Sequence, residues 1–374
     1  MLSKEDAVYR KWSKFKQSLP TFSLGTAIFL TCYTVLFFEL FLQLFSPVVL
    51  TPRYVVDGGY GVRGNWPGAK YSHYSREFGR IEFSINQQGA RSDNDFSLDK
   101  PSGVFRIVAF GDSFTAGFGA RFEETYLEQM KDRLIDLTSR DVEVINFGVS
   151  GHGTAEELVA LQALGLRFEP DVVLFQWHHT DLQDNIRSQL FGVDESGLRR
   201  LNDSYLPAVG IRERLFRNSL YRFVAEHSMS YTWVRNKAAQ VTKRSLFRAR
   251  SERVNVQSDN NSERPHERRK SGTLGQQELA IALLKEARRV SELSGAEFQV
   301  LDVPYRPERG IFESTFPKNS GLEEFIYSPI SEFDSHSGEV LYWERSAGHF
   351  SRLGNKIVGQ GLATAIARSL NTFE

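Results

Sequence analysis

The chain has 374 residues, and its 46 Lys and Arg residues balance its 46 Asp and Glu residues. Hydrophobic residues make up 41% of the chain and charged residues 25%, a globular composition that allows one large domain or two smaller ones. The zero net charge provides no overall field for nucleic acid, so we expect no nucleic-acid partner. A single cysteine, Cys32, excludes an intrachain disulfide.

An apolar stretch near the N-terminus, residues 21–50, carries one charge, Glu39. About 20 apolar residues are enough for a transmembrane helix, and Pro20 and Pro47 stand where such a helix can begin and end. A buried soluble helix is the alternative, but a helix that is apolar on all faces favours a membrane span. The stretch lacks the short apolar core and small-residue exit of a cleaved signal peptide. We therefore predict an uncleaved transmembrane helix over residues 21–46.

The charges that flank this span predict its orientation. Residues 1–20, the predicted cytoplasmic tail, contain five Lys or Arg and two acidic residues, whereas Arg53 alone follows shortly after the span. Positive residues are retained on the cytoplasmic side of a membrane. We expect a single-pass protein that uses the lipid bilayer as a partner, with its C-terminal bulk periplasmic or extracellular.

Beyond the span we expect a stalk and a small lead-in over residues 51–104, which are rich in Gly, Tyr and Arg. From residue 105 onward, apolar strands alternate with helical patterns. Strands are expected at 105–110, 142–148, 170–178 and 297–305, and helices at 123–137, 154–166, 276–293 and 354–370. This alternation predicts a parallel sheet covered by helices on both faces, within a domain over residues 105–374.

A long insertion interrupts the pattern over residues 187–275. Its first half has aromatic anchors such as Tyr221, Tyr231 and Trp233, whereas residues 242–270 are basic, polar and poor in large apolar side chains. This composition favours a mobile loop. Two roles stay open for it: a solvated linker, or a basic patch that contacts anionic lipid or an acidic polymer.

Three short motifs fall at the carboxyl ends of predicted strands, where parallel α/β sheets bind ligands, and a fourth precedes the last helix. They are GDSFTAG at 111–117, FGVSGHGT at 147–154, WHHTDLQDN at 177–185 and SAGHFSRLGN at 346–355. A serine hydrolase needs a hydroxyl, a base and oxyanion donors. Ser113 can supply the hydroxyl, His349 the base, and the backbone N–H groups of Ser113 and Gly151 the donors. Taken singly, a serine after a strand is more often a helix cap.

The order and placement of the four motifs resemble the GDSL/SGNH hydrolase superfamily, over residues 105–185 and 340–370. The resemblance implies a three-layer α/β/α, flavodoxin-like fold with Ser113 as nucleophile and His349 as base. It also implies that Gly151 is an oxyanion donor. The anchor, lead-in and insertion are similar to those of membrane-tethered members, which act on acylated polysaccharides or other envelope esters.

Two positions depart from the family's pattern. Thr180, followed by Asp181, stands where the family has an oxyanion Asn, and a Thr hydroxyl reaches less far than an Asn amide. We expect Asp181 to brace the loop. The Asp before the base is missing, which leaves Glu344 or a backbone carbonyl to orient His349. The expected substrate is an ester on a small molecule or glycan. O-acyl transfer to a glycan, and a weak or inactive carbohydrate-binding homologue, are the alternatives.

A metal site is a further interpretation of the third motif, because His178, His179 and Asp181 can all ligate metals. Adjacent residues of a strand point to opposite faces, so the two histidines cannot share one ion. We therefore expect no metal and no cofactor.

Overall fold

The computed structural model describes residues 23–45, 49–258, 265–346 and 348–372. The chain divides into two compact units, residues 1–46 and residues 47–374. In the first unit, helix α2 (Leu24–Phe45) is long and apolar enough to cross a membrane, by length and composition alone. The Gln43 amide donates a 3.1 Å hydrogen bond to Glu39, so the carboxylate in this helix has a polar neighbour. Positions 21, 22 and 46 of the predicted span lie outside the described residues.

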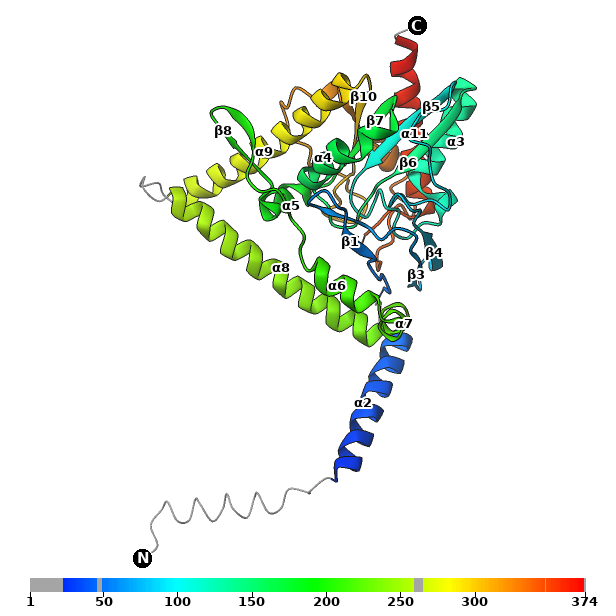
Figure 1. The fold of residues 1–374 in the computed structure, drawn as a ribbon, viewed down its shortest axis with the longest axis vertical. Coiled ribbons are helices and arrows are strands. Elements are labelled where there is room, and N and C mark those ends of the chain that lie inside the picture. The colour runs from blue at the N-terminus through cyan, green and yellow to red at the C-terminus, as the bar shows by residue number, and fades with distance from the viewer. Residues whose placement is uncertain (1–22, 46–48, 259–264, 347, 373–374) are drawn as a thin grey trace, which may run out of the picture. The chain divides into compact units, whose positions relative to one another are not determined.

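The second unit is built on a five-stranded parallel sheet (Figure 1). Its strands are β5 (Val104–Phe110), β6 (Asp141–Asn146), β7 (Val172–Trp177), β10 (Glu297–Asp302) and β11 (Ile326–Tyr327). They lie in the spatial order β6-β5-β7-β10-β11. Counted along the chain this is the order 2-1-3-4-5 of flavodoxin-like folds, which confirms the predicted fold class. The fifth strand was not predicted, because two residues carry no periodic signal.

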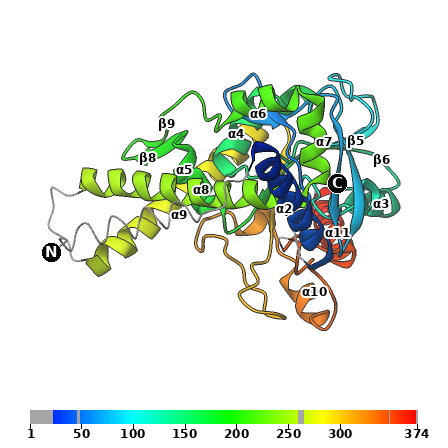
Figure 2. The same cartoon turned by 90° about the horizontal axis from the view of Figure 1, so that it is seen from below.

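Helices cover both faces of the sheet because the strands are apolar on both sides. In β5, Ile107 and Ala109 belong to one core, with residues of α3 (Tyr126–Thr138) and α11 (Arg352–Thr372). Val108 and Phe110 belong to the other, with α4 (Thr154–Ala163) and α9 (Pro265–Leu293). This alternation is the two-residue period of a strand. Figure 2 shows α3 and α11 on one side of the sheet and α4 and α9 on the other.

The segment predicted as stalk and lead-in carries two antiparallel hairpins. The first pairs β1 (Val55–Asp57) with β2 (Arg63–Asn65), and the second pairs β3 (Lys70–Ser75) with β4 (Gly79–Ser84). Tyr71 and Phe83 of the second hairpin share an aromatic core with Phe118, which lies in the loop after β5. The lead-in therefore packs directly on the segment that contains the GDSFTAG motif.

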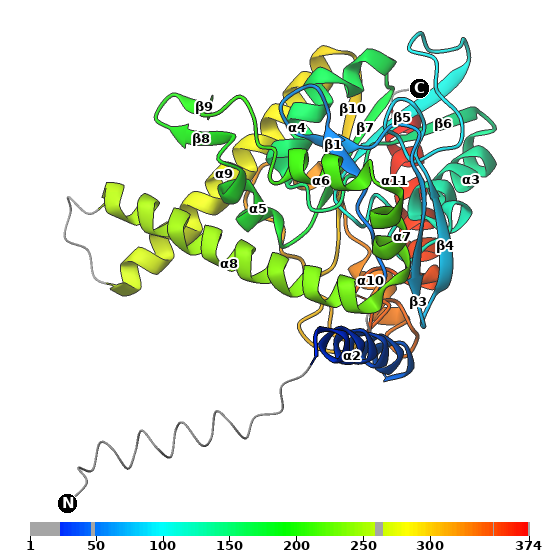
Figure 3. The same cartoon turned by 60° about the horizontal axis from the view of Figure 1, so that its bottom comes forward.

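The long insertion contains a hairpin and several helices. In chain order these are β8 (Phe191–Asp194), β9 (Gly197–Arg200), α6 (Val209–Phe216), α7 (Ser219–His227) and α8 (Met229–Ser258). Hairpin β8–β9 lies beside α9 (Figure 3). The elements that complete the unit are α5 (Asp181–Ser188), α10 (Ile330–Ser335) and the single turns Phe122–Glu124, Gly165–Phe168 and Glu323–Phe325.

The prediction of a mobile loop over residues 242–270 is wrong for the described backbone. Helix α8 continues to Ser258 and α9 begins at Pro265, and residues 259–264 lie outside the described residues. Arg, Lys, Gln and Glu are good helix formers. A shortage of apolar side chains therefore predicts that a segment is exposed, and does not predict that it lacks secondary structure.

Candidate active site

A serine and a histidine from distant parts of the chain meet beyond the carboxyl end of β5. Ser113 lies in the loop that follows this strand, and His349 in the loop that precedes α11. Nε2 of His349 lies 2.7 Å from Oγ of Ser113. This distance is within the range for direct proton transfer between a hydroxyl and a base. The structure thus brings the expected hydroxyl and the expected base together.

The surroundings of His349 favour its neutral form. Its side chain is buried against the rings of Phe114 and Phe118, with ring centroids 4.9 and 5.4 Å away. This burial lowers the pKa of His349 from 6.5 to about 4, although the negative charge of Asp112 acts in the opposite direction. At neutral pH the imidazole is therefore uncharged and able to accept a proton.

The two candidate orienting groups for His349 have separate surroundings. Nδ1 of His349 lies 3.4 Å from the carbonyl oxygen of Ser346, a long contact for a hydrogen bond. Oε1 of Glu344 lies 3.9 Å from a guanidinium nitrogen of Arg306 and 3.4 Å from one of Arg309. Among the described residues, the backbone carbonyl is therefore the group that faces Nδ1, and Glu344 belongs to a separate ion-pair cluster.

The serine loop is held in place by bonds to its own side chains and to β7. Oδ1 of Asp112 accepts a 2.8 Å bond from the backbone N–H of Phe114, which closes a turn around Ser113. Oε1 of Gln176 accepts a 3.0 Å bond from the backbone N–H of Asp112. Burial raises the pKa of Asp112. These bonds fix the position of Ser113 relative to strands β5 and β7 of the sheet.

The two backbone N–H groups expected to bind the oxyanion have no hydrogen-bond acceptor in the described residues. In the described parts of the chain, neither the N–H of Ser113 nor that of Gly151 donates a hydrogen bond. Gly151 has φ +79°, a conformation that favours glycine. Its carbonyl accepts a 2.7 Å bond from Arg63, which also forms a 2.8 Å ion pair with Glu156. The lead-in therefore fixes the orientation of the Gly151 peptide.

The third motif has a different arrangement from the expected oxyanion donor. Oγ1 of Thr180 lies 2.9 Å from Nδ1 of His178, so this hydroxyl already has a partner. Oδ2 of Asp181 accepts a 2.9 Å bond from the backbone N–H of His178. Asp181 is fully buried, and burial together with the nearby charge of Glu157 raises its pKa well above the usual range. Thr180 and Asp181, through these contacts with His178, therefore close the turn at the start of α5.

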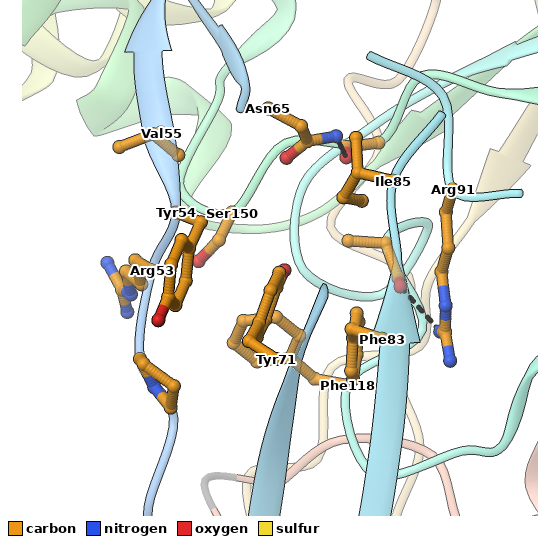
Figure 4. A pocket seen from close by; sticks show the side chains of 13 residues that line it. Arg53, Tyr54, Val55, Asn65, Tyr71, Phe83, Ile85, Arg91, Phe118 and Ser150 are labelled. Carbon is orange, nitrogen blue, oxygen red and sulfur yellow. Dashed lines mark hydrogen bonds between the residues drawn. The ribbon is translucent and has the colours of Figure 1, made fainter. Parts of the chain in front are cut away.

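A cavity of about 650 Å³ contains Ser113 and His349 in its wall. The rest of its wall combines aromatic side chains with cations. The aromatic residues are Phe78, Phe118, Phe216, Tyr221, Tyr231 and Trp233, and the cations are Arg53, Arg212, Arg235, Lys237 and Arg345. Figure 4 shows a separate, smaller pocket, which shares Arg53 and Phe118 with this cavity and is also lined by Tyr54 and by Ser150 of the second motif. The sequence already pointed to three of these aromatic residues, Tyr221, Tyr231 and Trp233. It did not point to the cations, because they belong to no motif.

One family model matches the part of the chain that contains the first three motifs. Residues 109–201 match the model of the GDSL-like lipase/acylhydrolase family. A lipase structure from a goat rumen metagenome has 16% identity and a TM-score of 0.35, covering 70% of this chain and 97% of that one. A psychrotrophic esterase from a Pseudoalteromonas species has 16% identity and a TM-score of 0.35, with coverage of 71% and 98%. An acetylxylan esterase from Geobacillus stearothermophilus has 12% identity and a TM-score of 0.36, with coverage of 70% and 94%. No curated protein matches the chain.

The contact between the serine loop and the second motif depends on a glycine, Gly148. A Cβ at this position would lie 2.3 Å from the backbone nitrogen of Ala116 and 2.7 Å from the backbone carbon of Thr115. We expect Gly148→Ala to displace the serine loop and to reduce the free energy of unfolding by about 2 kcal/mol or more. Urea unfolding of the full chain in detergent measures this change.

Gly275→Ala is the matched control, because a Cβ at that helical position meets nothing within 4 Å. This control should leave stability unchanged or raise it by up to about 1 kcal/mol. Equal effects of the two substitutions would contradict the described packing of the serine loop.

Proposed function

We propose that the chain is a membrane-anchored serine ester hydrolase that forms an acyl-Ser113 intermediate, because residues 109–201 match the model of the GDSL-like lipase/acylhydrolase family. The observation that carries this proposal is the 2.7 Å contact between Ser113 Oγ and His349 Nε2 in the wall of a large cavity. A neutral imidazole at this distance can take the hydroxyl proton as the oxygen attacks a carbonyl carbon.

In the first half of the reaction, Ser113 Oγ forms a bond to the acyl carbon and its proton moves to His349 Nε2. The carbonyl oxygen gains the negative charge and is bound by the free N–H groups of Ser113 and Gly151. The imidazolium forms beside Asp112, whose charge favours it. When the tetrahedral intermediate collapses, the alcohol leaves with the proton from His349.

In the second half, His349 takes a proton from water, and the water oxygen attacks the acyl carbon of the intermediate. Collapse breaks the bond to Ser113 Oγ, which regains its proton from His349, and releases the carboxylic acid. Thr180 is the proposed third oxyanion donor only if its hydroxyl leaves His178, with which it is paired here. Two backbone donors therefore carry the proposal.

The proposed substrate is an ester on a bulky molecule such as an acylated glycan. Aromatic faces along the cavity, including Tyr221, Tyr231 and Trp233, suit the flat apolar faces of large ligands. The acetylxylan esterase named above acts on an acetylated glycan. Release of the same acyl group to a glycan hydroxyl rather than to water is the alternative reaction of this intermediate.

Substitution of the nucleophile tests the proposal directly. We expect Ser113→Ala to lower kcat/KM for 4-nitrophenyl acetate by at least about 10³-fold, because no acyl-enzyme can form. Steady-state kinetics of the full chain in detergent measures the loss, with Ser196→Ala in the β8–β9 hairpin as a control that should retain activity. Full activity of Ser113→Ala would refute the mechanism. Product analysis with added glycan separates hydrolysis from acyl transfer.

The buried position of His349 predicts an unusual pH dependence. A base works in its neutral form, so activity should fall as the pH falls through the pKa of His349, which burial lowers from 6.5 to about 4. We expect kcat/KM for a neutral ester to remain high at pH 5.5. The midpoint of its decline should lie within about one pH unit of pH 4. A pH–rate profile measures this limb. An acid limb centred near 6.5 would contradict the described burial of His349.

The proposed topology places residues 49–372 outside the cytoplasm, with α2 as the span. The excess of Lys and Arg before the span supports this orientation. Protease added to intact spheroplasts should therefore digest the catalytic unit, whereas a cytoplasmic marker protein should survive. Protection of the catalytic unit until the membrane is lysed would exclude this orientation.

A further inference from the structure

The wall of the active-site cavity has an unbalanced charge. It contains the cations Arg53, Arg212, Arg235, Lys237 and Arg345, and no Asp or Glu is among its lining residues. Over the whole chain the two signs are equal in number. The imbalance is therefore a local property of the surface that surrounds Ser113 and His349.

Three of these cations come from separate segments and converge. Arg53 precedes β1, Arg212 lies in α6, and Arg235 lies in α8. Helix α6 lies beside β1 (Figure 3), which brings the first two segments together. All three guanidinium groups are partly buried. Burial, together with repulsion from Arg235 and Arg212, lowers the pKa of Arg53 to about 9.

The three guanidinium groups have few partners in the protein. Among the described residues, the Arg53 side chain forms no hydrogen bond or ion pair, and Nη1 of Arg212 is buried without a hydrogen-bond partner. Arg235 donates to the carbonyl oxygen of Thr51 at 3.1 Å and to Asn236, both neutral acceptors. Partly buried cations without a counter-charge are costly. Their free donors suit an anion, such as a carboxylate or a phosphate group, that accepts two bonds from one guanidinium group.

Arg53 also lies close to the proposed reaction centre. Its Nη1 atom lies 4.0 Å from the position that a Cβ on Gly151 would occupy, so it adjoins the proposed oxyanion loop. It shares the cavity wall with Ser113. An anionic group bound by the three guanidinium groups would therefore belong to the same molecule as the ester that Ser113 attacks.

We infer that the substrate is an anionic ester, with a carboxylate or phosphate group that Arg53, Arg212 and Arg235 bind beside the scissile bond. This inference rests on the proposed ester hydrolase function and specifies its substrate class. The cations then act in substrate binding, and their free donors are filled when the substrate is present.

Matched acetate esters test the inference with the full chain in a non-ionic detergent. The probes are 4-acetoxybenzoate, 4-acetoxyphenyl phosphate and the neutral isostere 4-acetoxybenzamide, with each rate divided by that of hydroxide-catalysed hydrolysis. We expect kcat/KM to be at least about tenfold higher for one or both anionic esters, because a charge-assisted hydrogen bond is worth roughly that factor. The preferred anion distinguishes a carboxylate-bearing from a phosphate-bearing substrate.

Arg212→Gln and Arg235→Gln should each reduce this preference, the ratio of kcat/KM for the anionic ester to kcat/KM for the neutral ester, by about tenfold. Arg289→Gln is the matched control, because Arg289 is exposed on α9 and paired with Glu286. Raising NaCl from roughly 0.05 M to 0.5 M should also weaken the preference in the wild type. This salt series keeps the test valid if a variant does not fold.

The outcomes separate the inference from the function on which it rests. Serine-dependent hydrolysis of all three esters without an anion preference would overturn the inference and leave the hydrolase proposal standing. Calorimetry of Ser113→Ala with 4-acetoxybenzoate supplies a readout without turnover. If 4-acetoxybenzoate binds to Ser113→Ala and this binding depends on Arg212 and Arg235, while the wild type hydrolyses none of the esters, the hydrolase proposal is refuted and the anion site is supported. If 4-acetoxybenzoate does not bind to Ser113→Ala and the wild type does not prefer the anionic esters, the proposed anion site is wrong.

Discussion

The hydrogen bond between Ser113 and His349 joins two loops that are 236 residues apart, and the rest of the site depends on it. It forms because a side chain of the last helix ties the two loops to one framework. Oδ1 of Asn355 accepts a 3.0 Å bond from the backbone N–H of Tyr126, and its Nδ2 donates to the carbonyl oxygen of Phe350. The Tyr126 hydroxyl in turn lies 2.9 Å from Oγ1 of Thr115, within the serine loop.

The acidic side chains near the site and the arginines of the cavity wall form two separate groups. The carboxyl groups of Asp112, Glu157 and Asp181 are buried and lie close enough to repel one another, and burial raises the pKa of each. In the cavity wall lie the guanidinium groups of Arg53, Arg212 and Arg235, which form no ion pair with an acidic side chain in the described parts of the chain. A negative charge on Asp112 favours the imidazolium that forms during the reaction. The same separation suits a substrate whose own negative charge faces the arginines. In this account His349 acts without a neighbouring acid on Nδ1, where the described contact is a backbone carbonyl.

The parallel sheet could be predicted from the sequence because its strands are apolar runs separated by amphipathic helices. The meeting of Ser113 and His349 could be predicted because each residue stands at a fixed place relative to a strand or helix. Strand β11 could not be predicted, since its two residues have no period of their own. Helix α8 could not be predicted over residues 242–258 from composition, because a polar segment rich in helix formers can be an exposed helix as well as a loop.

The arginines of the cavity illustrate a different limit. Arg53, Arg212 and Arg235 are surrounded by unrelated neighbours in the sequence, and only the packing of α6 against β1 and the start of α8 brings them to one wall. No motif or fixed spacing links these three arginines in the sequence. Their common position on one wall of the cavity is therefore visible only in the folded structure. Thr180 is the reverse case: its place in a motif suggested an oxyanion donor, yet its hydroxyl is paired with His178.

The central claim is that Ser113 is an activated nucleophile in the intact protein. A fluorinated or 4-nitrophenyl alkylphosphonate reacts covalently with such a serine, and mass spectrometry of the digested full chain locates the adduct. The account predicts one adduct, on the peptide that contains Ser113, which disappears in Ser113→Ala and forms far more slowly in His349→Ala. Failure of the folded wild-type protein to react, or equal labelling of the His349→Ala variant, would contradict it.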